Sequence, residues 1–149
     1  MATNSSNEII NTVGKWFEKV PSLPNNIREV LVKIAPILAL VFGVLGVLGG
    51  LVGLGLLTFL APFAVGMVYG YGVGMISAAV SIVTSALMLL AVPGLFAKKA
   101  NGWTILFWVE ALSVVGSVIA NPSASGIIGA VIGGAIGFYL LFQIRPYYK

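Results

Sequence analysis

Two long stretches of the sequence, 34–97 and 111–144, contain no charged side chain. A transmembrane helix needs about 20 apolar residues to cross roughly 30 Å of hydrocarbon, so stretches of this length indicate membrane spans. Of the 149 residues, 59% are hydrophobic and only 8% are charged. A soluble domain of this size has too little interior to bury so many apolar side chains. The sequence therefore predicts an all-α integral membrane protein.

Turn-forming residues divide the apolar stretches into four expected spans. Pro62 and the segment 69–72 indicate an uncharged turn, Pro93-Gly94 is expected to end the second span, and 121–125 indicates another turn. We therefore expect a four-transmembrane-helix bundle. Its spans are predicted at about 37–60, 73–92, 103–120 and 126–144.

The segment 7–20 has apolar residues at helical spacing with polar residues between them, which predicts an amphipathic helix. Its apolar side carries Trp16 and Phe17, and its polar side carries Lys15 and Lys19. This combination is typical of an interfacial helix that lies among lipid headgroups. A helix packed on another cytoplasmic protein is the alternative.

After Pro21–Pro24 a second short helix is expected to begin near Asn25, with Pro36 kinking its junction with the first span. The chain is accordingly divided into two parts. Residues 1–35 are predicted to form cytoplasmic amphipathic helices at the membrane surface, and residues 36–149 the four-span membrane domain.

The basic residues all fall on one side of this arrangement, and the two opposite loops have none. They are Lys15, Lys19, Arg28 and Lys33 before the first span, Lys98 and Lys99 between the second and third, and Arg145 and Lys149 after the fourth. Basic loops stay in the cytoplasm, so both termini are predicted to be cytoplasmic. The small size and short loops favour a prokaryotic inner membrane.

The net charge of +4 comes from residues at span ends rather than from a basic stripe with interleaved aromatic residues. Nucleic-acid binding is therefore not expected. The lipid bilayer is the expected surrounding, and anionic lipid headgroups are the natural counter-charge.

Glu110 is the one ionisable residue within an expected span, about 10 Å inside its cytoplasmic boundary. Ser113 and Ser117 follow on the same helical face, where their hydroxyls are able to hydrogen-bond the carboxyl group or line a wet crevice. Three roles remain open for Glu110: a protonated carboxyl bonded between helices, an ion pair, or a water-facing cation or proton site. Arg145 is the expected partner in an ion pair, with Lys33 as second choice.

Two spans contain glycines four residues apart, a pattern that lets helix backbones approach closely in a membrane. These candidate packing residues are Gly46, Gly49, Gly50 and Gly53 in the first span and Gly129, Gly133 and Gly137 in the fourth. They are expected either to close the bundle itself or to join subunits.

The chain has no Cys, His or Asp, so neither catalysis nor a metal or other cofactor is expected. The leading interpretation is a non-enzymatic, small polytopic membrane protein. It would form a homo-oligomer, or act as a scaffold or accessory subunit in a larger membrane complex, through its glycine-rich faces. The alternative is a small oligomeric channel or proton-coupled carrier that uses Glu110. Membrane remodelling by the amphipathic helix is a third hypothesis.

Overall fold

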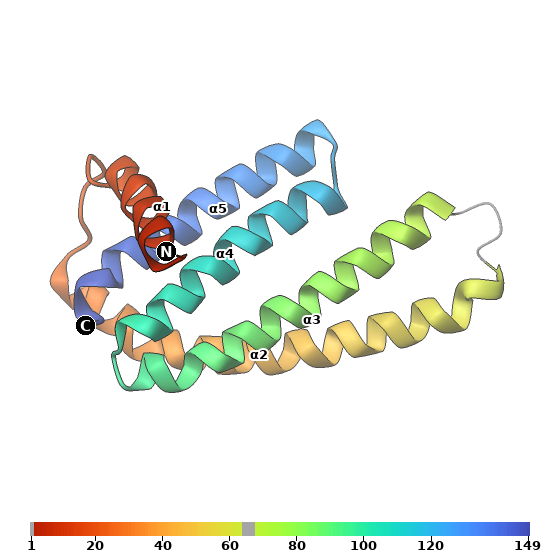
Figure 1. Cartoon of the computed structure of the whole chain (residues 1–149), viewed down its shortest axis with the longest axis horizontal. Helices are drawn as coiled ribbons and strands as arrows, with labels where there is room; N and C mark the ends of the chain where they lie inside the picture. The colour runs from red at the N-terminus through yellow and green to blue at the C-terminus, as the bar shows by residue number, and fades with distance from the viewer. Residues whose placement is uncertain (1, 64–67) are drawn as a thin grey trace.

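The computed structural model describes residues 2–63 and 68–149, with side chains from residue 5 to 63 and from 70 onward (Figure 1). Within these residues the chain folds into five α-helices and two short 3-10 helices. They are α1 (Ala2–Phe17), α2 (Asn25–Leu60), η1 (Ala61–Phe63), α3 (Val68–Phe96), α4 (Ala100–Ala120), α5 (Ala124–Ile144) and η2 (Arg145–Tyr147). The helices α2 to α5 are each long and apolar enough to cross a membrane. The predicted all-helical bundle with four such helices is confirmed.

Two prolines that were expected to bend or end helices lie inside them. The helix α2 is continuous from Asn25 through Pro36, so the expected short helix and the first span are one element. Pro93 lies inside α3, which continues to Phe96 and does not end at Pro93-Gly94 as predicted. A proline removes only one backbone donor, and an apolar surrounding offers the freed carbonyl no competing water, so the helix persists. The division of the chain at residues 35 and 36 therefore falls within α2 and stays a prediction.

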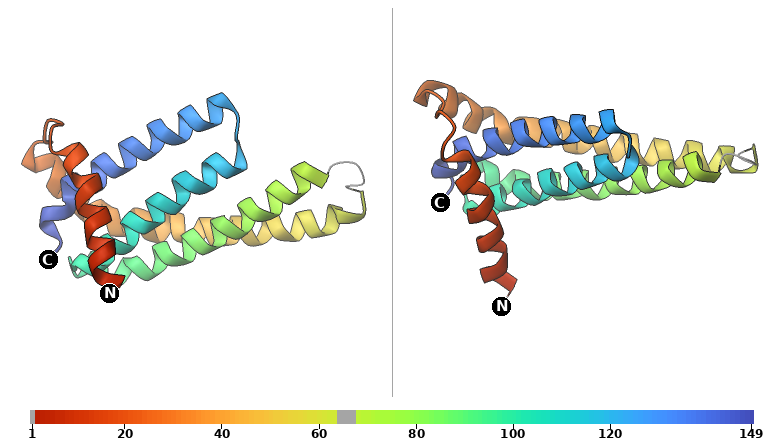
Figure 2. Two further views of the ribbon diagram at one scale, coloured as in Figure 1. Left: turned by 45° about the horizontal axis from the view of Figure 1, so that its top comes forward. Right: turned by 90° about the horizontal axis from the view of Figure 1, so that it is seen from above.

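The four long helices pack in chain order, α2 on α3, α3 on α4 and α4 on α5. The hairpins α2–α3 and α4–α5 meet at one end of the molecule and diverge toward the other (Figures 1 and 2). They also differ in length, since α3 has 29 residues and α4 has 21. At 1.5 Å per residue, α3 is longer by about 12 Å.

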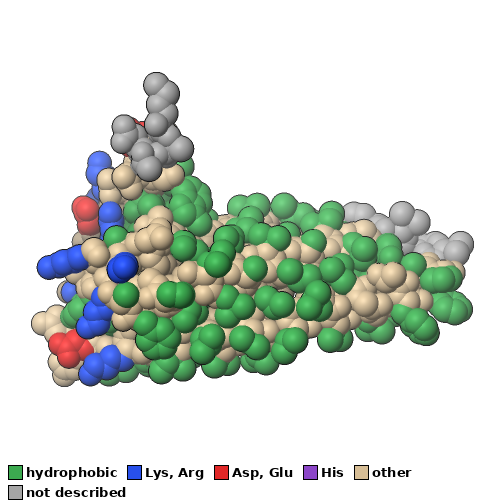
Figure 3. Space-filling view, turned by 60° about the horizontal axis from the view of Figure 1, so that its bottom comes forward, with side chains coloured by type: hydrophobic (Ala, Val, Ile, Leu, Met, Phe, Trp, Pro, Cys, Tyr) green, Lys and Arg blue, Asp and Glu red, His purple; other side chains and the backbone are tan. Residues whose placement is uncertain are grey.

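The eight Lys and Arg residues occur before residue 34, in the turn between α3 and α4, and after α5. These segments lie at the end where the hairpins meet, which we call the basic end (Figure 1). The Lys and Arg side chains visible in Figure 3 gather there. The rest of the face in Figure 3 is mostly apolar. Side chains such as Val52 and Phe59 are 69% and 73% exposed along α2. Outward-facing apolar side chains are what helices in hydrocarbon require, because lipid replaces water around them.

The buried core also lies toward the basic end. Its members are Ile10, Val32, Ala39, Ala91, Leu95, Trp103, Phe107, Ile144 and Tyr148. The indole Nε1 of Trp103 donates a 2.7 Å hydrogen bond to the carbonyl oxygen of Leu141 and ties α4 to α5. Lys149 adds a backbone connection, because its N–H donates to the Lys98 carbonyl at 3.0 Å and its carbonyl accepts from Ala100 N–H at 3.2 Å.

The helix α1 runs across the basic end rather than along the long helices (Figure 2). One edge of its apolar side packs on the protein, since Ile10 is 3% exposed and Phe17 stacks on Phe142 of α5 with ring centroids 5.7 Å apart. The other edge remains uncovered, because Trp16 is 69% and Ile9 is 47% exposed. The apolar face of α1 is thus divided between the protein and its surroundings.

Candidate functional site

Glu110 projects from α4 toward α5 and lies against Gly137. A Cβ atom added at Gly137 would stand 2.5 Å from Cδ of Glu110, so the absence of a side chain there makes room for the carboxyl group. The Glu110 side chain is half-buried. Among the described residues, no hydrogen bond or ion pair holds its carboxyl group. Such a group is costly in hydrocarbon unless a proton, water or another polar group compensates it.

The structure does not bring Glu110 and Arg145 together. Arg145 Nη2 donates instead to Asn11 Oδ1 at 3.1 Å. The Arg145 guanidinium also lies over the ring of Trp103, with Cζ 5.2 Å from the ring centroid. Trp103 is seven residues before Glu110 in α4, about 10 Å along the helix axis. Arg145, the expected ion-pair partner of Glu110, thus contacts the Asn11 amide and the Trp103 ring instead.

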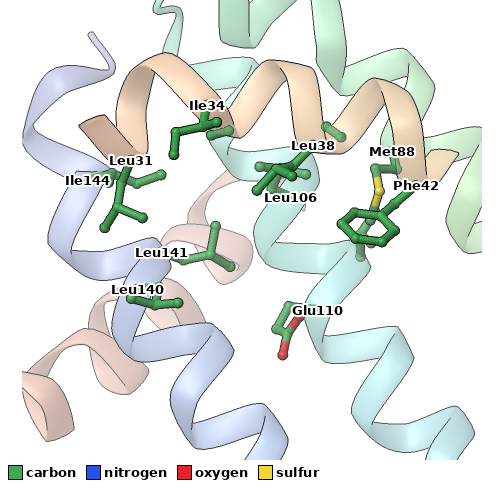
Figure 4. A pocket seen from close by; sticks show the side chains of 13 residues that line it. Leu31, Ile34, Leu38, Phe42, Met88, Leu106, Glu110, Leu140, Leu141 and Ile144 are labelled. Atoms are coloured by element: carbon green, nitrogen blue, oxygen red, sulfur yellow. The ribbon is translucent and has the colours of Figure 1, made fainter. Parts of the chain in front are cut away.

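Glu110 lines an apolar cleft of about 240 Å³ between α2, α4 and α5 (Figure 4). Leu38 and Phe42 of α2 and Leu140 of α5 contribute to its walls. Of the described residues that line the cleft, Glu110 is the one with an ionisable side chain. The wall of the cleft is therefore apolar except for this one carboxylic acid residue.

A second cavity, the α4–α5 groove, has a volume of about 350 Å³ and also includes Glu110. Ser113, Ser117 and Asn121 continue its α4 wall away from the basic end. Small residues of α5 form the opposite wall: Gly126, Gly129, Ala130, Gly133 and Gly134. The groove thus brings together three of the predicted polar residues, Glu110, Ser113 and Ser117.

The hydroxyl of Ser117 is satisfied within its own helix, because Oγ donates to the Ser113 carbonyl oxygen at 2.8 Å. A hydroxyl oxygen that donates in this way still accepts hydrogen bonds from a neighbour. Ser113 and Ser117 also line a separate cavity of about 240 Å³ between α3 and α4, together with Ser81 and Thr84. Hydroxyl groups therefore lie on both sides of α4.

The predicted glycines divide into two groups according to what a Cβ atom would meet. At Gly46 it would lie 3.0 Å from Ser85 Cβ, and at Gly50 it would lie 3.3 Å from the Ala78 carbonyl oxygen, so both contact α3 closely. Gly53 leaves an ordinary distance of 3.9 Å to Ala78 Cβ. A Cβ at Gly49, Gly129 or Gly133 would meet no atom of the described chain within 4 Å.

Three other residues position the helices and were missed by sequence reasoning: Gly94, Gly102 and Gln143. A Cβ at Gly94 would lie 2.8 Å from Gly102 Cα, so the backbones of α3 and α4 touch at this crossing. Gln143 is 6% exposed and accepts hydrogen bonds from Leu23 N–H at 3.1 Å and from the Arg28 side chain. Two features of the sequence could have identified them. Gly94 and Gly102 stand on either side of the short turn between α3 and α4, and Gln143 is a polar residue in the last turn of the apolar helix α5.

The predicted membrane-surface residues do not share one environment. Phe17 is half-buried and stacks on Phe142, whereas Trp16, Lys15 and Lys19 are exposed. The exposed three lie at the basic end, on or just after α1.

The chain matches no protein-family model, no curated protein and no solved structure. Within residues 2–63 and 68–149, no three His, Cys, Asp or Glu side chains lie close enough to hold a metal ion. The fold defines the class, a small helical protein with four helices long and apolar enough to cross a membrane. The α4–α5 groove, with Glu110 at one end, is its candidate functional site.

Proposed function

We propose that this chain is a non-enzymatic, small polytopic membrane protein that self-assembles, with the α4–α5 groove as the contact between two copies. The observation that carries this proposal is the open space at Gly129 and Gly133. Those glycines allow a second helix to approach the α5 backbone closely. Assembly of membrane helices depends on such close packing, because lipid tails are as apolar as the side chains.

The polar wall of the groove supports the same contact. The Glu110 carboxyl group has no hydrogen-bond partner among the described residues, while Ser113 and Ser117 line the same groove. A two-fold contact places the same surface on both sides, so a second copy would bring its own hydroxyl groups to this carboxyl. The contact would thus relieve an unpaired polar group as well as bury apolar surface.

The sidedness that we propose places the basic end and both termini in the cytoplasm, at a prokaryotic inner membrane. The clustering of all Lys and Arg residues at that end supports this orientation. The exposed Trp16 supports a position of α1 among the headgroups, since an indole ring favours that level of the bilayer. A scaffold or accessory role in a larger complex would use the same free groove.

The test of self-assembly uses leucine substitutions at glycines that have open space. Gly129→Leu and Gly133→Leu should block the contact without disturbing the monomer, and should weaken self-association about tenfold or more. Gly49→Leu is the matched control, because Gly49 is equally open but lies on α2. Counting photobleaching steps of labelled protein in liposomes measures the oligomeric state. A monomeric wild type, or a loss of oligomers in Gly49→Leu alone, would contradict the proposal.

A small oligomeric channel or proton-coupled carrier is the second candidate. It is favoured by the position of Glu110, which lines both the apolar cleft and the α4–α5 groove. A carboxyl group beside the hydroxyl and amide groups of the α4–α5 groove is suited to accept and release a proton there. Proton flux into liposomes that contain the wild type, and its loss in Glu110→Gln, would favour this function over assembly alone. Flux no greater than in empty liposomes would exclude it.

A further inference from the structure

A polar cavity of about 530 Å³ lies at the basic end, between α1, the connection to α2, and the end of α5. Three cationic side chains from different elements line it: Lys15 from α1, Arg28 from α2 and Arg145 from η2. Glu18 is the one carboxylate among the described residues of its wall. None of the three cations forms an ion pair within the described residues. The cavity therefore has an excess of positive charge.

Arg28 is held in place by a neutral group. Its Nε and Nη2 both donate to Gln143 Oε1, at 3.0 and 2.6 Å. An amide oxygen fixes the orientation of the guanidinium but does not neutralise it. Two of the five N–H donors of Arg28 are used in this way, and the others remain available to an anion.

Arg145 is held by neutral groups as well. Its Nη2 donates to Asn11 Oδ1 at 3.1 Å, and its Cζ lies 5.2 Å from the ring centroid of Trp103 and 5.9 Å from that of Phe142. Aromatic faces attract a guanidinium and restrict its rotation while leaving its edge free to donate. Both arginines are thus oriented without a carboxylate partner.

The walls of the cavity are fixed by bonds between distant parts of the chain. Tyr139 Oη donates to the Pro21 carbonyl oxygen at 2.7 Å, and Leu23 N–H donates to Gln143 Oε1 at 3.1 Å. These bonds hold the connection between α1 and α2 against α5. A site whose donors are ordered before binding loses less conformational entropy when a ligand arrives.

We propose that this cavity binds the phosphate group of an anionic lipid headgroup. Guanidinium groups donate to phosphate oxygens with matched, charge-assisted geometry, and Lys15 adds a third cation. The cavity lies at the charged end of the fourth candidate span, where Gln143 in the last turn of α5 is followed by Arg145. The ends of a helix that spans a bilayer are surrounded by lipid headgroups. This site differs from the α4–α5 groove and does not depend on self-assembly.

The test compares two double variants that remove the same charge from the same end of the molecule. Arg28→Gln with Arg145→Gln changes the cavity, and Lys98→Gln with Lys99→Gln changes the turn between α3 and α4. Native mass spectrometry of the full chain in neutral detergent measures bound phosphatidylglycerol, with diacylglycerol as the phosphate-free lipid. The arginine variant should bind phosphatidylglycerol about tenfold more weakly, and the lysine variant should bind like wild type.

Equal losses of phosphatidylglycerol binding in both double variants would show that the lipid is attracted by surface charge in general, and would overturn the proposal. Unchanged binding in both variants would also overturn it. If the arginine variant unfolds, the same lipid-binding measurement is made on Lys15→Gln and Lys98→Gln. The Lys15 side chain is exposed, so its replacement should leave the protein folded. A several-fold loss is then expected in Lys15→Gln alone, and equal binding by the two variants would overturn the proposal. Displacement of the lipid by millimolar inorganic phosphate would overturn the assignment to a lipid and favour a soluble phosphate compound.

Discussion

The carboxyl group of Glu110 on α4 occupies the space that Gly137 on α5 leaves free. A methyl group at residue 137 would overlap that carboxyl group, so Gly137→Ala must displace the Glu110 side chain or separate the helices. We expect this substitution to lower the free energy of unfolding by about 1–3 kcal/mol. Thermal unfolding in detergent micelles measures the change.

Gly133→Ala, one helical turn earlier on α5, is the matched control. The position is open, so a methyl group gains helix propensity and should change stability by less than about 1 kcal/mol, in the stabilising direction. Equal losses in the two variants would mean that Gly137 does not accommodate Glu110.

The contact between Gly94 and Gly102 leads to a second prediction. A Cβ at Gly102 would lie 2.6 Å from the carbonyl carbon of Gly94, and a backbone atom cannot rotate away as a side chain does. Gly102→Ala should therefore destabilise the protein by about 2–3 kcal/mol. Gly55→Ala, which adds the same methyl group in open space on α2, should be neutral or slightly stabilising. A chemical-denaturant titration that ranks the two variants in the opposite order would refute this account of the α3–α4 crossing.

Adjacent aromatic residues of α1 should respond differently to truncation. Phe17 stacks on Phe142, so Phe17→Ala should cost about 1–3 kcal/mol of stability in detergent. Trp16 is 69% exposed, so Trp16→Ala should leave stability within about 0.5 kcal/mol. The melting temperatures of the two variants give the comparison. Similar losses of stability in the two variants would show that Trp16 is packed against the protein and would contradict this prediction.

Patterns of charge and hydropathy predicted the number of long helices but not how prolines act within them. Charge-free stretches long enough to span a membrane leave little choice of secondary structure, because every backbone polar group there must bond within its own helix. That same requirement keeps α3 continuous through Pro93, where the helix was expected to end. It also keeps α2 continuous through Pro36, where a separate short helix was expected to join the first span.

Burial raises the pKa of the Tyr148 phenol above its ordinary value of 10.0. The folded protein therefore favours the neutral phenol, and this contribution to stability is full below about pH 10 and is lost as the pH rises further. The Tyr148→Phe variant lacks the phenol hydroxyl, so residue 148 cannot ionise in it. The difference in unfolding free energy between wild type and Tyr148→Phe should shift in favour of the variant as the pH rises above about 10.

At neutral pH the two proteins should differ by less than about 1 kcal/mol, because Tyr148 Oη is buried without a hydrogen-bond partner in the described structure. Denaturant titrations at several pH values make the comparison. A loss above about 2 kcal/mol at neutral pH would indicate a partner for this hydroxyl.

A cysteine at residue 110 reports directly on the α4–α5 groove, since the chain has no cysteine of its own. If the groove is the contact between copies, Glu110→Cys should be protected from a small water-soluble thiol reagent in membranes. Adding Gly133→Leu should then restore labelling at least several-fold. Trp16→Cys, at an exposed position, is the control for reagent activity. Rapid labelling of Glu110→Cys in both backgrounds would instead favour the water-filled pathway of a channel or carrier.

The surroundings of Arg145 could not be predicted from the sequence. Helical spacing identifies residues that share a face of one helix, and Glu110, Ser113 and Ser117 line one groove in the structure. Two partners of Arg145 come from distant parts of the chain: Asn11 of α1, 134 residues earlier, and Trp103 of α4. The crossing of α1 over the end of α5 brings Asn11 to Arg145, and the packing of α4 on α5 brings Trp103 there. No local sequence pattern predicts either contact.

The unequal lengths of the two hairpins impose a condition on the bilayer itself. Because α3 is about 12 Å longer than α4, no single hydrocarbon thickness suits both pairs of helices at the same tilt. The shorter pair, with 21 residues in each helix, fits a hydrocarbon layer of about 30 Å with little tilt. The longer pair must then tilt further from the bilayer normal or thicken the lipid around it. Each molecule would thus be surrounded by an annulus of deformed lipid. Two copies that place the same hairpin next to each other would share the deformed lipid between them. Membrane thickness would also help to set where the protein accumulates.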